Sequence, residues 1–225
     1  MPSVSEAVSN FSEAKSDGNV AMDNAVLSGQ HQHARQLLAT IPGGKEMKEN
    51  WNDFFEMLIK HEGGFTSDSR DAGNKEDGHG NQGSTMLGVT AYNWARYTGK
   101  PAPMEVMKQL TKEDVKPFYE KNYWTPIRGN DLFSGLDYSV ADMAVNAGVS
   151  RGAKLLQRVL AVTRDGKIGN QTLKAMHDHE PKELIEKYYD ARESFYRKLD
   201  DYKTFGRGWS RRNKETLEKS LSMIS

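Results

Sequence analysis

Apolar side chains recur at helical spacing along most of the chain, and this pattern constrains the fold more than any other feature. Between residues 51 and 59 they fall at positions i, i+3, i+4, i+7 and i+8, as on a helix with one buried face. The strongest such run is Leu184, Ile185, Tyr188, Tyr189, Phe195, Tyr196 and Leu199, and similar patterns run over 136–147, 152–160 and 169–177. Strand signals are weak, apart from short pairs within the loop at 63–90. The sequence therefore predicts a mainly α protein.

Shorter helices are expected between these runs. Residues 90–97 favour one helix, and Thr111 with Asp114 forms a capping box for another. Pro117 is expected to distort the first turns of that second helix. A final helix is expected from Asn213 towards the end of the chain.

The overall composition excludes several classes of protein. The 225 residues suffice for one sizeable domain, or for two small ones that share a core. The 31 basic and 31 acidic residues balance, so no global field gathers nucleic acid. The absence of cysteine excludes disulfides and thiolate metal sites. No apolar stretch approaches the ~20 residues of a membrane helix, so no membrane insertion is expected.

The chain divides into three regions. Residues 1–48 are dominated by small and polar side chains, which predicts a flexible N-terminal extension. Residues 49–134 are expected to form a first folded domain, and residues 135–225 a helical region packed against it. A long polar loop at 63–83 interrupts the first of these domains. Loops of this length inside a compact domain are usually functional, so candidate site residues are sought there.

Glu62 is the first candidate, because it stands where an amphipathic helix should end before two glycines. It lies four residues after Leu58 and seven after Phe55, and so on the helix face that is expected to be buried. Poor solvation and the negative end of the helix dipole would both raise its pKa. Such a carboxyl group keeps its proton near neutrality and can act as a general acid. The alternative is a structural glutamate paired with Lys60 or Arg70.

Asp71 is the second candidate, nine positions after Glu62 in the polar loop. Glycoside hydrolysis needs one protonated carboxyl group and one that stays ionised. A solvated aspartate on the loop would meet the second requirement. The spacing is weak evidence by itself, and the alternative is that Asp71 only forms a turn.

Three ordered segments resemble glycoside hydrolase family 108, the phage-type N-acetylmuramidases of the lysozyme-like superfamily. They are His61-Glu-Gly-Gly-Phe65, Asp68-Ser-Arg-Asp71 and Ser84-Thr-Met-Leu-Gly-Val-Thr90. The likeness continues through Tyr119-Glu-Lys-Asn-Tyr-Trp124 and Phe205-Gly-Arg-Gly-Trp-Ser-Arg211, and so covers about residues 50–212. It implies that residues 49–134 form a lysozyme-like catalytic domain with a short β-hairpin at 63–90.

The resemblance also implies roles for particular residues. Glu62 matches the family's general acid, while Asp71 and Thr85 match residues that position a water molecule. The expected reaction is cleavage of the β-1,4 bond between N-acetylmuramic acid and N-acetylglucosamine, without a metal or an organic cofactor. Substrate-binding positions are expected at Asp68, Gly88 and Tyr92. Two alternatives stay open: a lytic transglycosylase, and a non-catalytic protein that binds cell wall or serves a virion.

The family pattern is interrupted by an apparent insertion at 75–82. It separates Asp71 from Thr85, and it brings two rival second carboxylates, Glu76 and Asp77. It also contains His79, which is expected to be a polar loop residue. Ser69 replaces the proline that is usual in the family.

A second resemblance lies further along the chain. Leu156-Gln-Arg-Val-Leu160 and Asp165-Gly-Lys-Ile-Gly-Asn-Gln-Thr172 are similar to a peptidoglycan-binding module. The Asp165–Gly166 dipeptide favours a tight turn and Gly169 to Thr172 a helix start, so the motif is expected to be largely structural. The module implies bacterial peptidoglycan as the partner.

Several Trp and Tyr side chains of this chain could stack on sugar rings, as aromatic side chains do in carbohydrate-binding grooves. Trp124 and Trp209 are nevertheless expected in the core, because aromatics at helical spacing usually are. Tyr92 is left as a stacking candidate.

The start of the chain has neither the basic residues nor the apolar run of a signal peptide. A phage-type lysin of this kind would be a monomer in the host cytoplasm. A holin would release it to the periplasm and the cell wall, or a virion would carry it there.

Overall fold

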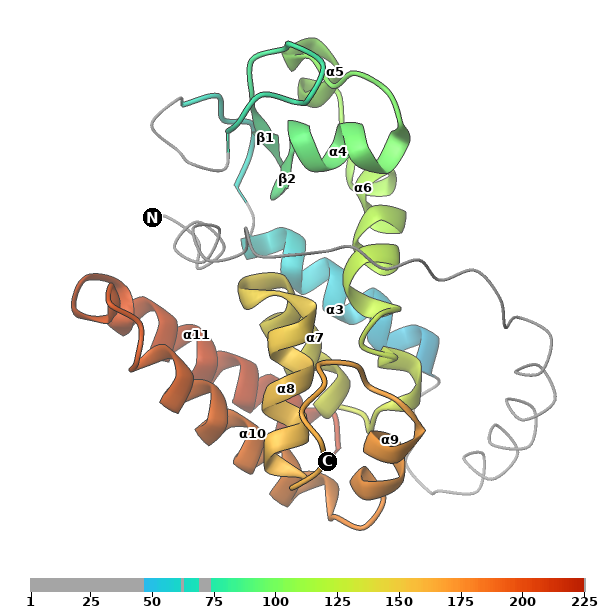
Figure 1. The fold of residues 1–225 in the computed structure, drawn as a ribbon, viewed down its shortest axis with the longest axis vertical. Helices are drawn as coiled ribbons and strands as arrows, with labels where there is room; N and C mark the ends of the chain where they lie inside the picture. The colour runs from blue at the N-terminus through green and yellow to red at the C-terminus, as the bar shows by residue number, and fades with distance from the viewer. Residues whose placement is uncertain (1–46, 62, 69–73, 225) are drawn as a thin grey trace, which may run out of the picture.

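The computed structural model describes residues 47–61, 63–68 and 74–224 (Figure 1). One end of the molecule holds a two-stranded antiparallel sheet and two short helices. These elements are β1 (Thr85–Met86), β2 (Val89–Thr90), α4 (Ala91–Thr98) and α5 (Met104–Lys108). The other end holds α7 (Leu136–Ala147), α8 (Val149–Val159), α9 (Asn170–Met176), α10 (Pro181–Tyr196) and α11 (Tyr202–Ser222).

Two helices join these ends. They are α3 (Met47–His61) and α6 (Lys112–Tyr119), which continues into the π-helix η2 (Glu120–Trp124) and then the 3₁₀-helix η3 (Gly129–Asp131). The predicted mainly α fold is therefore confirmed, as is the short hairpin in the 63–90 loop. No helix in the described part of the chain is long and apolar enough to cross a membrane.

Helix α7 is the centre of the larger end. All of its twelve residues except Val145 are buried, as expected for a helix that is surrounded by others. It packs against α3, α8, α10 and α11. The helical runs predicted from the sequence thus pack around one central helix.

Trp124 and Trp209 both lie in the core, as predicted. Trp124 is 2% exposed, and its ring centroid lies 5.5 Å from that of Trp51 and 5.8 Å from that of Phe54. A Cβ on Gly129 would stand 2.4 Å from the Trp124 ring, so glycine leaves the space that this ring fills. The cluster joins α3 to the end of the π-helix.

A buried ionic network connects α7 to α10 and α11. Arg192 donates to Asp142 Oδ2 at 2.5 Å and to the Ser139 carbonyl oxygen at 3.2 Å. Arg212 donates to Asp142 Oδ1 through both Nε and Nη2, at 3.1 and 2.8 Å. Burial alone would raise the pKa of Asp142, but the guanidinium groups of Arg212 and Arg192 outweigh it and lower the pKa to about 2. Asp142 is therefore ionised at neutral pH and bonded to both arginines.

A second buried carboxyl group links α3 to the start of α7. Asn50 Nδ2 donates to Asp137 Oδ2 at 2.9 Å, and the Tyr138 N–H donates to Asp137 Oδ1 at 2.6 Å. Burial, opposed by these hydrogen bonds, raises the pKa of Asp137 to about 7. No cationic group takes part in this arrangement among the described residues.

Asp137 should make stability depend on pH. The pKa of Asp137 is 3.8 in the unfolded chain and about 7 in the folded protein. Its protonation therefore stabilises the folded state fully below pH 3.8, and this stabilisation is lost as the pH rises to about 7. In Asp137→Asn this loss should be absent. Between pH 4 and 7, the free energy of unfolding of the parent should fall relative to that of Asp137→Asn by about 1 kcal/mol per pH unit. Urea unfolding at several pH values measures this difference, and parallel profiles for the two proteins would contradict the assignment.

Two helices differ from their predicted form. Pro117 was expected to distort the first turns of its helix, but α6 is continuous from its Thr111–Asp114 capping box to Tyr119, and the departure from α-geometry follows at η2. The last helix begins at Tyr202 and not at Asn213. Gly206 allows this earlier start, because a Cβ there would stand 2.7 Å from the Tyr202 ring.

Candidate active site

The helix that precedes Glu62 forms as predicted. Its five apolar positions are all buried: Trp51, Phe54, Phe55, Leu58 and Ile59. Glu62 follows the last residue of α3 in the sequence. Glu62 and Asp71 themselves lie outside the described residues, so their catalytic roles stay predictions.

Thr85 stands in the middle of three short antiparallel segments. Its N–H and carbonyl oxygen exchange hydrogen bonds with those of Thr66, at 2.8 and 2.9 Å. On its other side it pairs with Thr90 across the β1–β2 hairpin. The backbone on both sides thus fixes the position of Thr85.

Asn74 holds the Thr85 side chain. Thr85 Oγ1 lies 2.7 Å from Asn74 Oδ1, and Asn74 Nδ2 donates to the Asp68 carbonyl oxygen at 2.9 Å. Because a carbonyl oxygen can only accept, the second contact fixes which way the amide points. Thr85 must then donate its hydroxyl proton to Asn74. The sequence patterns gave no sign of Asn74, because its two partners are non-local.

The insertion at 75–82 closes on itself. A Cβ added to Gly83 would lie 2.0 Å from the Lys75 oxygen and 2.2 Å from the Asn74 oxygen, so the chain returns at Gly83 to where it left. Asn74 and Thr85, on either side of the insertion, therefore remain in contact. The added residues do not separate the two ends of the loop.

Asp77 is the anchor of this insertion. Its carboxylate is buried and accepts from the Ala102 N–H at 2.8 Å, the His79 N–H at 2.8 Å, and both Asn81 N–H and Nδ2, at 3.1 and 2.9 Å. Burial opposes ionisation, but these hydrogen bonds hold the pKa of Asp77 well below its usual range. Asp77 therefore fixes the loop, which leaves little room for a role as second catalytic carboxylate.

The other two residues considered in the insertion are exposed. Glu76 Oε1 accepts from the Gly80 N–H at 2.7 Å and thus caps a turn. His79 is exposed, and its contact with Asp77 is made by its backbone N–H. Neither side chain is turned into the fold.

The hairpin turn is fixed by α6. Leu87 and Gly88 have positive φ angles of 48° and 75°, as a two-residue type I′ turn requires. The Tyr119 hydroxyl donates to the Leu87 carbonyl oxygen at 2.9 Å, and the Tyr119 ring lies 6.1 Å from that of Phe55 on α3. Tyr119 thereby sets the position of the hairpin relative to the helix that leads to Glu62.

The predicted substrate-binding residues lie at the surface. Asp68 and Gly88 are exposed, and Tyr92 is 42% exposed. The Arg96 guanidinium lies 5.6 Å from the centre of the Tyr92 ring. Their roles towards a substrate stay predictions. Within the described residues, no group of three or more His, Cys, Asp or Glu could hold a metal ion.

Comparison with known families identifies the part of the chain that holds these residues. Residues 55–148 match the family model for glycosyl hydrolase 108. The chain carries a glycosyl hydrolase 108 domain. Thr85 and Asn74 both lie in this glycosyl hydrolase 108 domain, as do Glu62 and Asp71. The family resemblance, the lysozyme-like fold and the glycosidase class expected from the sequence are confirmed.

Residues 151–214 match a second family model, described as "Predicted Peptidoglycan domain". The first match ends at residue 148, between α7 and α8, and the second begins at residue 151 in the first turn of α8. The glycosyl hydrolase 108 domain is thus followed by a domain directed at cell-wall peptidoglycan. The division of the chain at residue 134 stays a prediction.

Among solved structures, that of SagA from Brucella abortus is similar to this one. It is 29% identical, with a TM-score of 0.68, and the alignment covers 79% of this chain and 97% of SagA. No curated protein matches the chain.

The motif in the peptidoglycan domain is structural, as the sequence suggested. Gln157 is buried, and its amide nitrogen Nε2 donates to Asp165 Oδ1 at 2.7 Å and to the Lys167 carbonyl oxygen at 3.0 Å. Its Oε1 accepts from the Gly166 N–H at 2.9 Å. Gly166 has a φ of 81°, which glycine adopts without strain. The motif therefore holds the turn between α8 and α9.

Proposed function

We propose that this chain is a muramidase, which hydrolyses the β-1,4 bond between N-acetylmuramic acid and N-acetylglucosamine in peptidoglycan. One observation carries the proposal: the Asn74 side chain joins Thr85 to the backbone of Asp68. This bridge ties together the residues that flank 69–73, the segment that contains Asp71. It supports a water-positioning role for Thr85 and Asp71 inside a glycosyl hydrolase 108 domain.

In the proposed reaction, Glu62 donates its proton to the glycosidic oxygen as the bond to the muramic acid carbon breaks. A water molecule attacks that carbon and gives up a proton to Asp71. Thr85 donates its own proton to Asn74, so towards this water it can only accept a hydrogen bond. The water then donates one hydrogen to Thr85 and the other to Asp71, which turns its lone pair to the carbon. Direct attack of this kind inverts the anomeric centre.

The products of digestion test this proposal. Purified peptidoglycan treated with the protein should yield muramic acid at new reducing ends, formed first as the inverted anomer. Mass spectrometry identifies the ends, and NMR of fresh digests identifies the anomer. Anhydro ends would instead identify a lytic transglycosylase, and new N-acetylglucosamine reducing ends a glucosaminidase. Retained configuration would contradict the role given to the water.

Asn74 provides a second test. Asn74→Ala should lower kcat by about 10- to 100-fold, because Thr85 loses the acceptor that orients its hydroxyl group. KM should change less than kcat, since Asn74 acts through Thr85. Steady-state kinetics on solubilised peptidoglycan separates the two constants. The matched control is Gln82→Ala, an exposed position in the same loop, which should keep the parent kcat. An equal loss in both variants would indicate general damage to the loop.

We further propose the biological setting of a phage lysin, on the strength of the family resemblance. Such a protein waits in the host cytoplasm and is released by a holin. Expression in a Gram-negative host should then cause lysis only when a holin or another agent opens the inner membrane. Lysis without such an agent would contradict this setting.

A further inference from the structure

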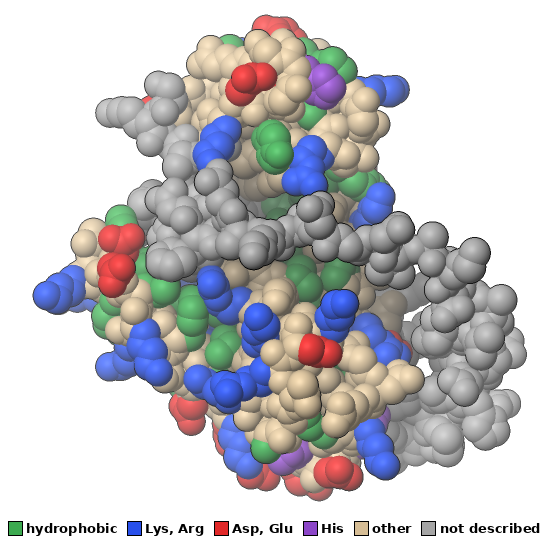
Figure 2. All heavy atoms as spheres, viewed as in Figure 1, with side chains coloured by type: hydrophobic (Ala, Val, Ile, Leu, Met, Phe, Trp, Pro, Cys, Tyr) green, Lys and Arg blue, Asp and Glu red, His purple; other side chains and the backbone are tan. Residues whose placement is uncertain are grey.

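Helix α8 presents a stripe of cations, formed by Arg151, Lys154 and Arg158. These residues are spaced i, i+3 and i+7, so they share one face of the helix. Across the described parts of the chain, none of the three makes an ion pair. Figure 2 shows several Lys and Arg side chains on the face where α8 lies in Figure 1. This cationic stripe is available to an anionic partner.

The balanced charge of the whole chain hides a difference between its two domains. Residues 151–214 contain 16 Lys and Arg against 9 Asp and Glu. Residues 55–148 contain 10 Lys and Arg against 13 Asp and Glu. The peptidoglycan domain is therefore basic while the glycosyl hydrolase domain is slightly acidic, and an anionic polymer is attracted to the first.

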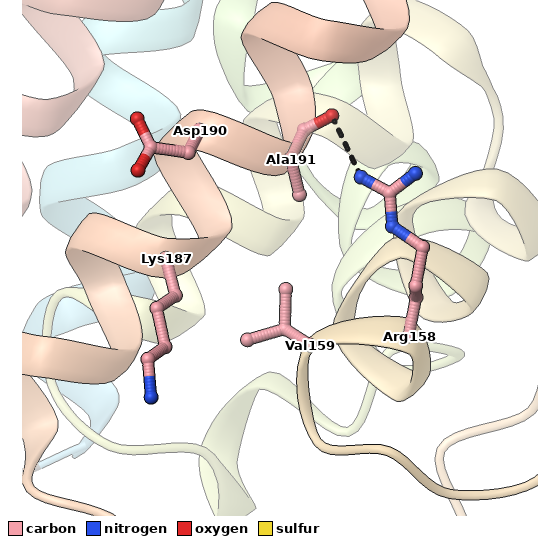
Figure 3. A pocket seen from close by; sticks show the side chains of 5 residues that line it. All are labelled: Arg158, Val159, Lys187, Asp190 and Ala191. Carbon is pink, nitrogen blue, oxygen red and sulfur yellow. Dashed lines mark hydrogen bonds between the residues drawn. The ribbon is translucent and has the colours of Figure 1, made fainter.

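The stripe follows the line along which α8 packs against α10, named here the α8–α10 groove. At one end lies a hollow lined by Arg158, Val159, Lys187, Asp190 and Ala191 (Figure 3). Arg158 Nη2 donates to the Ala191 oxygen at 3.4 Å, which positions the guanidinium group over the groove. Lys187 is bonded to Glu183 at 2.5 Å. A ligand that binds Lys187 must compete with Glu183, whereas Arg158 makes no ion pair with any described residue and can bind a ligand directly.

At the other end of the groove, the Arg151 guanidinium lies 5.1 Å from the centre of the Phe195 ring. Arg151 and Arg158 are two helical turns apart, a separation of about 10 Å along α8. In an extended peptide, three residues span about the same length. Both guanidinium groups are held by α10, so the groove offers two positioned cations at a spacing that suits a short acidic peptide.

We propose that the α8–α10 groove binds the carboxylates of the peptide stems of peptidoglycan. This inference rests on the proposed action on peptidoglycan and names the part of the polymer that the second domain contacts. Guanidinium groups pair with carboxylates in a bidentate manner, whereas the glycan strand is largely neutral and is usually bound by exposed aromatic rings. Phe195 in this groove is covered by Arg151. The peptide, and not the sugar, matches what the groove presents.

Binding to purified sacculi tests the inference. The groove variant combines Arg151→Gln, Lys154→Gln and Arg158→Gln. The matched control removes the same charge from exposed positions elsewhere in the domain, with Lys198→Gln, Lys203→Gln and Arg207→Gln. Both are made in the full chain with Glu62→Gln, so that cleavage does not consume the ligand. Thermal unfolding confirms that each variant folds.

In cosedimentation at low salt, the groove variant should bind sacculi at least about tenfold more weakly than the Glu62→Gln parent. The affinity of the control variant should stay within about twofold of that parent. Sacculi whose carboxyl groups have been converted to amides should bind the parent as weakly as native sacculi bind the groove variant. Equal loss in both variants, or undiminished binding to amidated sacculi, would overturn the inference. So would tighter binding to DNA than to sacculi. If the active protein cleaves no peptidoglycan but binding still depends on the groove, the proposed function fails and this inference stands.

Discussion

Glu62→Gln should lower the rate of peptidoglycan hydrolysis by roughly 10²- to 10⁴-fold, the contribution typical of a general acid. Glutamine has nearly the same shape and can still accept hydrogen bonds, but it cannot donate a proton to the leaving oxygen. KM should change little, because the lost interaction belongs to the transition state. A turbidity assay on permeabilised Gram-negative cells measures the rate, and the release of reducing ends confirms it.

The control for this variant lies on the same helix. Glu56 on α3 is exposed and lies 3.3 Å from Lys112, so Glu56→Gln removes a glutamate charge without touching the proposed chemistry. Exposed ion pairs contribute about 1 kcal/mol or less, and this variant should clear cells at the parent rate. If Glu62→Gln clears cells equally well, the general acid is another residue.

Asp142→Asn should lower the free energy of unfolding by about 3–5 kcal/mol. The reason is the burial of Arg192, whose side chain is 1% exposed and would lose its counter-charge. Arg192 Nε already has no hydrogen-bond partner among the described residues, so the guanidinium group has little left to compensate the loss. Arg212 is 23% exposed and can turn towards water, so its share of the cost is smaller. Urea unfolding followed by circular dichroism measures the change.

Two further variants make this prediction specific. Glu218→Gln removes an exposed ion pair with Lys214 on α11, and it should change stability by less than about 0.5 kcal/mol. Arg192→Met should cost less in the Asp142→Asn background than in the parent, because the buried charge is already uncompensated there. Simple addition of the two effects would mean that the ion pair is not coupled.

The features predicted well from the sequence are local ones. The buried face of α3 follows from apolar spacing alone, and the Thr111–Asp114 capping box from two residues three positions apart. The turn at Gly166 likewise follows from its own dipeptide. In each case the interacting residues are close in sequence, so the local sequence pattern is enough to predict the structure.

The missed features depend on residues far apart in the chain. The sequence offers Asp77 as a rival second carboxylate and does not predict its buried structural role, because the Ala102 N–H that it binds lies 25 positions later. Asn74 and Thr85 are 11 positions apart, and no sequence pattern around either residue predicts their contact. The sequence predicts the last helix from Asn213, whereas α11 begins at Tyr202, where Gly206 leaves space for the Tyr202 ring. Such contacts are decided by tertiary packing, which periodicity does not record.

The self-closing insertion at 75–82 has a consequence for how this protein can vary. Its ends meet at Gly83 and Lys75, and Asp77 fastens its interior to Ala102. The contact between the Asn74 and Thr85 side chains therefore does not depend on the number of residues in this segment. We therefore expect insertions, deletions or a grafted binding loop within this segment to leave the Asn74–Thr85 contact in place.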